Sequence, residues 1–141
     1  KAVNAQYDDC DALVMAAAVS DYRPAVRAEN KIKKEQHDHL NIELTENPDI
    51  LYGLGQKKTH QFLVGFAAET RDVIEYGKAK LAKKNLNLLV ANDVAQQGAG
   101  FNVSTNIAAL IYKDGHIEQY LKMTKDDLGH IIIEKIAEGI N

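Results

Sequence analysis

Three short apolar runs, separated by segments with helical features, place the strongest constraint on how this chain folds. The runs are residues 12–18 (ALVMAAA), 61–67 (QFLVGFA) and 86–92 (LNLLVAN). Strands that are buried on both faces read as continuous apolar runs of this length, and they occur in parallel sheets covered by helices. The alternation of strands and helices therefore predicts an α/β, Rossmann-like domain with three layers and a mostly parallel central sheet.

The segments around these runs carry the signals of helix ends and of a hairpin. Asn47-Pro48-Asp49 has the residues of a helix start, with Asn47 as the N-cap and Pro48 in the first position. Asp114-Gly115 is typical of a hairpin turn. The sequence predicts, by range, a helix end at 1–8, a loop or flap at 25–38 and a strand at 41–44. A helix opens at 47–49 and ends around 57–60, and further helices span 69–84 and 124–140. A loop is predicted at 96–105 and a C-terminal hairpin at 106–121.

Length, charge and cysteine content exclude several classes of protein. The chain has 141 residues, which is the size of one domain. Its net charge of −3 predicts that nucleic acid is not a partner, and the absence of a long apolar run predicts no membrane span. The single cysteine, Cys10, cannot form an internal disulfide, which indicates a reducing, cytoplasmic location.

The ends of the apolar runs are the first places to look for a site, because ligands bind beyond the carboxyl ends of strands in parallel sheets. The alanines at residues 16–18 let a ligand approach the backbone. Asp21 can accept hydrogen bonds from a ribose, a base or a metal-bound water. Close helix packing and an ordinary turn explain the same residues without a ligand. The corresponding positions after the three runs are residues 16–21, 66–70 and 92–94.

Lysines gather at two places in this acidic chain. Lys31 opens the run KIKK at 31–34, which suits either phosphate binding or a solvated loop. Lys80 and Lys84 fall on one side of the predicted helix at 69–84, one turn apart. They suit either a phosphate chain or the favourable placement of positive charge at a helix C-terminus. Residues 48–51 present a helix N-terminus, which favours an anion and also fits ordinary capping.

Tyr76 and Lys80 match the Tyr-x-x-x-Lys pair that supports hydride transfer in short-chain dehydrogenases. This pattern raises an alternative function, an NAD(P)-dependent oxidoreductase. The chain contains no Gly-x-Gly-x-x-Gly motif, and residues 62–64 (FLV) lack the serine that such enzymes carry upstream of the pair.

Seven motifs, taken in order, are similar to those of one known family and cover essentially the whole chain. They are AAAVSDYRP at 16–24, KIKK at 31–34, NPDIL at 47–51, VGFAAET at 64–70, KNL at 84–86, ANDV at 91–94, and GFN at 100–102 followed by TN at 105–106. The chain resembles the phosphopantothenate–cysteine ligase domain of the bacterial bifunctional flavoprotein of coenzyme A biosynthesis.

The resemblance implies a ligase that joins 4′-phosphopantothenate to L-cysteine using CTP, by way of an acyl-cytidylate intermediate. It implies that Lys31 stabilises charge during activation and that Mg²⁺ accompanies the triphosphate, with no metal ligands assigned. FMN belongs only to the decarboxylase half of such proteins, and the family forms homodimers. The nucleotide-binding residues that carry over are Met15, Ala16, Ala17, Asp21, Lys31, Pro48, Asp49, Ile50, Leu51, Phe66, Lys80 and Lys84.

The chain departs from the family pattern in one respect. The family domain begins with a strand, a Gly-rich turn and a segment with a catalytic Asn, and this sequence holds none of these. We therefore expect residues 1–141 to correspond to the C-terminal two-thirds of the ligase domain, and, if the chain folds alone, to bind CTP weakly without forming product. A further alternative is a non-catalytic dimerisation module, in which the flap at 25–44 pairs across two subunits.

Overall fold

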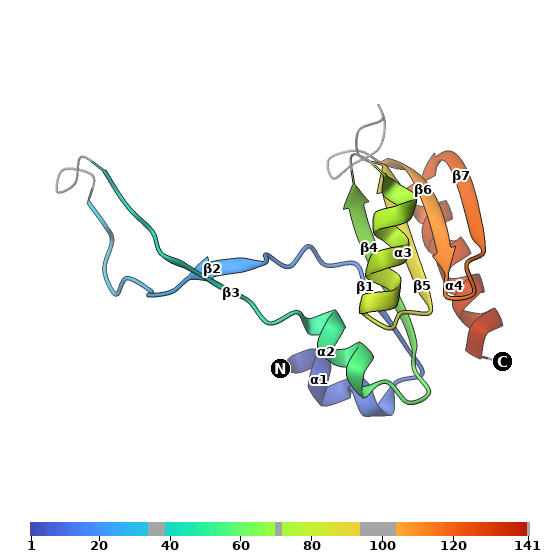
Figure 1. Ribbon diagram of the computed structural model, residues 1–141, viewed down its shortest axis with the longest axis horizontal. Helices are drawn as coiled ribbons and strands as arrows, with labels where there is room; N and C mark the ends of the chain where they lie inside the picture. Colours follow the sequence, from blue (N-terminus) through green and yellow to red (C-terminus); the bar gives the residue numbers. More distant parts are fainter. Residues whose placement is uncertain (34–38, 70–71, 94–103, 141) are drawn as a thin grey trace. The chain divides into compact units, whose positions relative to one another are not determined.

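The computed structural model describes residues 1–33, 39–69, 72–93 and 104–140. The chain divides into two compact units (Figure 1). The sheet unit comprises Lys1–Ala16 and Ile50–Asn141, and the ribbon unit comprises Ala17–Asp49. Each unit has its own architecture.

Five strands form one sheet in the sheet unit, in the order β1-β4-β5-β6-β7 (Figure 1). β1, β4 and β5 run parallel to one another, and β6 and β7 extend the sheet as an antiparallel hairpin. The predicted parallel strands and C-terminal hairpin are therefore confirmed, and the hairpin belongs to the same sheet. The strands are β1 (Ala12–Met15), β4 (Phe62–Glu69), β5 (Leu88–Asp93), β6 (Thr105–Tyr112) and β7 (Ile117–Thr124).

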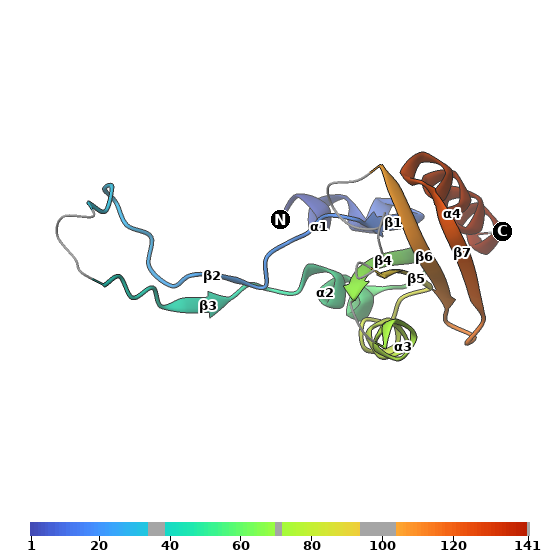
Figure 2. The ribbon, with the colours of Figure 1, turned by 90° about the horizontal axis from the view of Figure 1, so that it is seen from above.

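Helices cover both faces of this sheet. α3 and α4 lie on opposite faces (Figure 2), so that the predicted three-layer, Rossmann-like α/β architecture is confirmed. The helices are α1 (Ala2–Gln6), the 3-10 helix η1 (Tyr7–Asp9), α2 (Ile50–Lys57), α3 (Val73–Lys83) and α4 (Lys125–Ile140).

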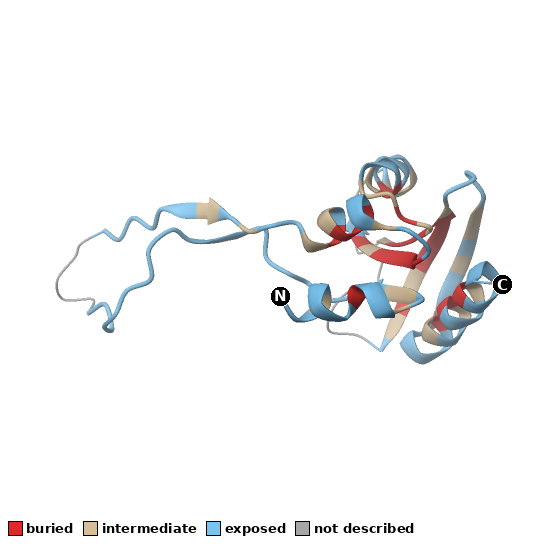
Figure 3. Cartoon of the chain, turned by 90° about the horizontal axis from the view of Figure 1, so that it is seen from below, coloured by how far each residue is buried: buried red, intermediate tan, exposed pale blue. Residues whose placement is uncertain are grey.

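Alternate residues of the central strands supply two cores, one on each face of the sheet. On the α3 face Leu63 packs with residues of α2 and α3, and the hydroxyl of Tyr7 donates a hydrogen bond of 3.2 Å to the carbonyl oxygen of Leu54. On the α4 face Val64 packs in a second cluster with Leu128. The buried residues follow the central strands (Figure 3).

The prediction of a strand at 12–18 buried on both faces is wrong. β1 ends at Met15, and β4 is its neighbour in the sheet, so that β1 forms an edge. Val14 lies beside Val64 on the α4 face and is 40% exposed, because α4 packs over β4, β6 and β7. An apolar run at a sheet edge thus has the same composition as a central strand without its burial.

A second correction concerns the boundary between β4 and α3. The sequence predicts a strand at 61–67 and a helix from residue 69, whereas β4 continues to Glu69 and α3 begins at Val73. Pairing with β5, which sets Ala68 beside Asn92 and Glu69 beside Asp93, keeps these residues extended. Tertiary pairing overrides the local helix signal here.

The helix predicted to open at 47–49 begins later than expected, because α2 starts at Ile50, whereas its end at Lys57 lies within the predicted 57–60. Asn47, expected as the N-cap, makes other hydrogen bonds. Its Nδ2 donates to the carbonyl oxygen of Ser20 at 2.8 Å, and its Oδ1 accepts a bond of 2.9 Å from Nη1 of Arg23. Pro48 therefore precedes the first turn rather than occupying it.

The predictions for the C-terminal elements are confirmed. Gly115 takes a positive φ of 91° in the turn between β6 and β7, a conformation that glycine adopts without strain. Thr124 caps α4, since its Oγ1 accepts a hydrogen bond of 3.1 Å from the backbone N–H of Asp127.

The ribbon unit contains two short antiparallel strands, β2 (Tyr22–Pro24) and β3 (Leu44–Glu46). β3 overlaps the strand predicted at 41–44 only at Leu44, and β2 was not predicted. The ladder continues through a hydrogen bond of 2.9 Å from Ala25 N–H to the carbonyl oxygen of Glu43. No described residue of this unit is buried.

Parts of the predicted loops lie outside the described residues, namely 34–38 of the flap and 94–103, which include the GFN motif. The described part of the flap at 25–33 forms no strand, as predicted. Within the described ranges, none of the helices has the length and apolar character needed to cross a bilayer.

Candidate functional site

The carboxyl ends of β1, β4 and β5 form one edge of the sheet, and we call this the carboxyl edge. The register sets Met15 beside Gly65, so that Met15 and Ala16 lie next to Phe66. One step along the sheet, Phe66 pairs with Val90. The structure thus brings together three of the predicted site residues, at the edge where parallel sheets bind ligands.

The predicted residues of the sheet unit nevertheless divide between its two faces. Phe66 is half-buried and packs on the α4 face. Leu51 belongs to the core of the opposite face, together with Met15 and Ile50 at its margin. Leu51 is only 7% exposed, so a ligand would reach its backbone rather than its side chain.

Lys80 lies in the last turn of α3, and Lys84 is its C-cap, with an N–H that donates 3.0 Å to the Lys80 carbonyl oxygen. The chain enters β5 shortly after Lys84, and β5 begins at the edge of the sheet opposite the carboxyl edge. The backbone of both lysines therefore lies at the end of α3 that is remote from the carboxyl edge. Helical side chains lean towards the helix N-terminus. By this rule we expect the stem of Lys80 to lean back along α3 towards the carboxyl edge, whereas Lys84 lies outside the helix.

The other predicted residues belong to the ribbon unit and are all exposed. They are Ala17, Asp21, Lys31, Pro48 and Asp49. The backbone carbonyl of Asp21 accepts a hydrogen bond of 2.8 Å from Asn47 N–H, which closes the β2–β3 ribbon. The catalytic role of Lys31 stays a prediction.

Asn92 lies in the strand-end segment 92–94 that the sequence indicated, but it was not among the predicted binding residues. Its Oδ1 is buried and has no hydrogen-bond partner among the described residues. Asn92 pairs with Ala68 of β4, two residues beyond Phe66, and so lies on the same face as Phe66. A buried amide oxygen without a partner is costly, so Asn92 is a candidate ligand-binding group. The sequence signal that could have identified Asn92 is its position at the end of an apolar run.

A dedicated cation site is not found in the described residues, where no three His, Cys, Asp or Glu side chains gather. Mg²⁺ is commonly held by one or two carboxylates together with substrate phosphates. The described residues offer no preformed cation cage, which is the arrangement expected where Mg²⁺ arrives with substrate phosphates, and Mg²⁺ stays a prediction without assigned ligands.

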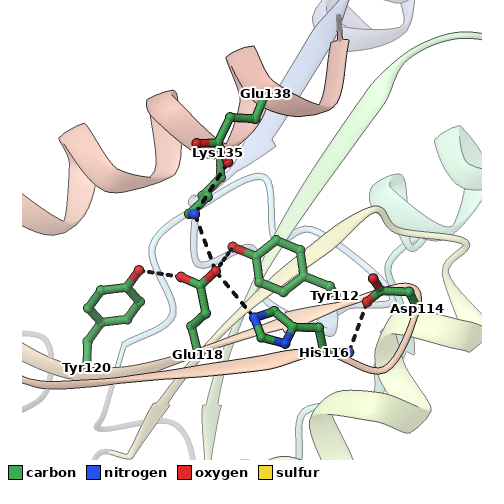
Figure 4. Close-up of polar contacts among 7 residues, drawn as sticks. All are labelled: Tyr112, Asp114, His116, Glu118, Tyr120, Lys135 and Glu138. Atoms are coloured by element: carbon green, nitrogen blue, oxygen red, sulfur yellow. Dashed lines mark hydrogen bonds and ion pairs between the residues drawn. The ribbon is translucent and has the colours of Figure 1, made fainter.

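A polar cluster around the Glu118 carboxylate joins β6 and β7 to α4 (Figure 4). The Tyr112 hydroxyl donates 3.0 Å to Glu118 Oε1, and the Tyr120 hydroxyl donates to Oε2. Lys135 Nζ lies 3.3 Å and His116 Nε2 lies 3.5 Å from Oε1. The carboxylate is thus fully used by the protein, and this cluster is structural.

These contacts shift the titration of the cluster. The Tyr120 hydroxyl, followed by Tyr112 and Lys135, holds the pKa of Glu118 below its usual value, although burial acts in the opposite sense. The bond to Glu118 raises the pKa of Tyr120, and burial is the main cause that raises the pKa of Tyr112. The folded protein therefore favours an ionised Glu118 between two neutral tyrosines.

We expect Glu118→Gln to lower the free energy of unfolding at pH 7 by about 1–2 kcal/mol, because a charge-assisted cluster is lost. A carboxyl whose pKa is lowered by folding stabilises the protein above its unfolded pKa, about 4.3, and this stabilisation disappears as pH falls through the folded-state pKa. The variant should therefore lose less stability in acid, as measured by urea unfolding at several pH values. Glu138→Gln, at an exposed partner of Lys135, is the control, and equal acid profiles for Glu118→Gln and the parent would contradict the expectation.

The fold and the carboxyl edge define a Rossmann-like α/β domain with a candidate ligand site at the strand ends. The solved C-terminal domain of a coenzyme A biosynthesis bifunctional protein CoaBC has the same fold, with a TM-score of 0.75 at 36% identity over 96% of this chain and 57% of that chain. A DNA/pantothenate metabolism flavoprotein from Streptococcus pneumoniae also shares the fold, with a TM-score of 0.75 at 22% identity over 99% of this chain and 65% of that one.

The model of the family "DNA/pantothenate metabolism flavoprotein C-terminal domain" matches residues 1–140, and the chain belongs to this family. The CoaBC protein of Bacillus subtilis is 46% identical over 97% of this chain and 34% of its own length. CoaBC of Escherichia coli K12 is 42% identical over 96% of this chain and 34% of its own length. The chain therefore spans about a third of the length of these relatives. They give no support to the oxidoreductase alternative.

Proposed function

We propose that this chain supplies the nucleotide-binding part of a phosphopantothenate–cysteine ligase, which uses CTP to join 4′-phosphopantothenate to L-cysteine. Family membership supports this proposal, together with the name of its relatives as proteins of coenzyme A biosynthesis. The observation that carries the nucleotide site is the buried amide oxygen of Asn92, which has no partner among the described residues and lies on the Phe66 face at the carboxyl edge.

The proposed reaction has two steps. The carboxylate of 4′-phosphopantothenate attacks the α-phosphate of CTP, which forms an acyl-cytidylate and releases pyrophosphate. The amine of cysteine then attacks the acyl carbon, an amide bond forms, and CMP leaves. The first step brings two anions together, so that positive charge must offset their repulsion. We assign this role to Lys31, Lys80 and Lys84, with Mg²⁺ bound to the triphosphate supplying Lewis-acid stabilisation.

The same proposal includes the part of the ligase domain that the chain represents, the place of FMN, and the location in the cell. We place its residues in the C-terminal two-thirds of the ligase domain, in keeping with the 57% of the solved C-terminal domain that it covers. We assign FMN to the decarboxylase half of such proteins and a cytoplasmic location to the whole, in keeping with the single Cys10.

The test is a calorimetric titration of the chain with CTP and Mg²⁺. We expect Asn92→Leu to weaken binding about 10-fold, because the ligand loses a hydrogen bond to a buried group. Thermal unfolding of the same samples checks that the variant is folded. Equal affinity of the folded variant and the parent for CTP would count against the site. In a separate measurement, an increase in NADH fluorescence when NADH is mixed with the chain would revive the oxidoreductase alternative.

We further propose that the ribbon unit pairs with a second copy of the chain. Leu40, Ile42 and Leu44 recur at every second position and are each more than half exposed, in a unit whose described residues include no buried side chain. A two-stranded ribbon is marginal in water without further cover.

Ile42→Lys is therefore expected to convert a dimer into a monomer in sedimentation, because it places a charge in the middle of this apolar row. Lys33→Ala, at an exposed position of the same unit, is the control. A parent chain that sediments as a monomer at high concentration would contradict the pairing, and a dimer that binds no nucleotide would favour the non-catalytic alternative.

A further inference from the structure

Asn106 is a second buried carboxamide, and the proposed function has not used it. It is 6% exposed, and its Oδ1 has no hydrogen-bond partner in the part of the chain that the structure describes. Buried polar atoms in native proteins are almost always paired, because an unpaired one retains its full desolvation penalty. An unpaired amide oxygen at a strand end is expected where a bound ligand donates the missing hydrogen bond.

The register of the sheet places Asn106 close to Asn92. Asn92 pairs with Ala108, and Asn106 is two residues from Ala108 on β6, so that Asn106 is a diagonal neighbour of Asn92 on the α4 face. On the other side the register with β7 shifts between Asn106, which pairs with Met123, and Ala108, which pairs with Tyr120. Met123 and Tyr120 both pack against the cluster on the α4 face, in keeping with Asn106 on that face. β5 and β6 lie side by side with α4 over this face (Figures 1 and 2).

The two carboxamides lie on the face of the sheet that carries the second apolar cluster. This cluster includes Val90, Leu110 and Leu128. A charged group on the same face, the Glu118 carboxylate, is already bonded to Tyr112, Tyr120 and Lys135. Two amide oxygens repel phosphate oxygens, and an apolar wall does not favour a cation. The chemistry that satisfies them is an uncharged N–H donor. The small side chains of Ala68 and Ala108 flank Asn92 in the sheet.

We propose that Asn106 is a further binding residue of the nucleotide site, and that its amide oxygen accepts a hydrogen bond from the exocyclic amino group of the base. The proposal rests on the proposed function, because it takes the base to lie on the Phe66 and Asn92 side of the carboxyl edge. Lysines on the α3 side then serve the phosphates. Asn106 in this role selects a base with an amino group, such as cytosine, over uracil, which presents a carbonyl oxygen there.

The first test needs no nucleotide. Asn106→Leu has nearly the same size and removes the unpaired oxygen, so we expect thermal unfolding at an equal or higher temperature than the parent. Asn87→Leu is the matched control, because Asn87 Oδ1 accepts bonds of 3.0 Å from Leu63 N–H and 2.9 Å from Lys58 Nζ. That variant should unfold several degrees lower. A comparable loss in Asn106→Leu would show a structural role and overturn the proposal.

The second test measures affinity for CTP and UTP, each with Mg²⁺. We expect the parent to prefer CTP, and Asn106→Leu to weaken CTP binding about 10-fold while leaving UTP binding nearly unchanged. If Asn106→Leu keeps the full preference for CTP, the base-reading role is wrong. A parent that binds neither nucleotide contradicts the proposed function. In that case the unfolding temperature of Asn106→Leu shows independently whether the Asn106 amide is paired within the protein.

Discussion

Gly55→Ala is expected to lower the free energy of unfolding by about 3 kcal/mol or more, which places it among the most damaging single changes in the chain. A Cβ atom at residue 55 would lie 1.9 Å from the carbonyl oxygen of Lys84. That oxygen belongs to the backbone and cannot rotate away, so α2 must move from the turn between α3 and β5. Asn85 Nδ2 also donates 2.9 Å to the Gly55 carbonyl oxygen, and this bond would be strained as well.

Gly53 provides a matched control on the same helix, because a Cβ atom there meets nothing within 4 Å. Gly53→Ala should raise the free energy of unfolding by about 0.5–1 kcal/mol, since alanine is the better helix former. Urea unfolding of both variants measures the contrast. Similar effects for the two substitutions would mean that α2 does not pack closely on the Lys84–Asn85 turn.

Lys80→Ala is expected to weaken CTP binding about 10- to 100-fold, the range for a lost hydrogen bond to a charged group. Lys80 lies in the last turn of α3, and its stem is directed back along the helix. Lys84→Ala should have a smaller effect, because Lys84 is one turn farther from the carboxyl edge. The contribution of both lysines should shrink as salt is added.

Lys78→Ala controls for the loss of charge on the same helix. Lys78 is exposed and pairs with Glu75 at 3.2 Å, three residues before it. Calorimetric titration with CTP and Mg²⁺ should give the same affinity for this variant and the parent. If Lys78→Ala and Lys80→Ala weaken binding equally, the lysines act only through the general potential of the surface, and Lys80 has no specific place in the site.

The sequence predicted the central strands well because burial on both faces leaves a clear signature in composition. The runs at 61–67 and 86–92 correspond to β4 and β5, which neighbouring strands and both helix layers cover. The run at 12–18 has the same composition but sits at an edge, and strand position is a property of the whole sheet. β2 escaped prediction because Tyr-Arg-Pro is held extended by its partner β3 rather than by local preference.

The candidate site was only partly accessible to sequence reasoning. The rule of strand ends and the family resemblance both pointed to Phe66 and to the region of Asn92. Neither indicated that the amide oxygens of Asn92 and Asn106 are buried with no partner in the described part of the chain, because this depends on the register between three strands. Nor did periodicity on a single helix show that Lys80 and Phe66 belong to opposite faces of the sheet.

The most direct test is to follow the ¹⁵N-labelled chain by NMR as CTP and Mg²⁺ are added. We expect the largest shifts at the carboxyl edge, in the backbone signals of Phe66 and Ala68 and the side-chain amide of Asn92. Signals of Asn87 and Lys113, whose backbones pair at 3.2 Å near the opposite edge, should stay in place. Shifts confined to that opposite edge, or no shifts at millimolar CTP, would contradict a nucleotide site at the carboxyl edge.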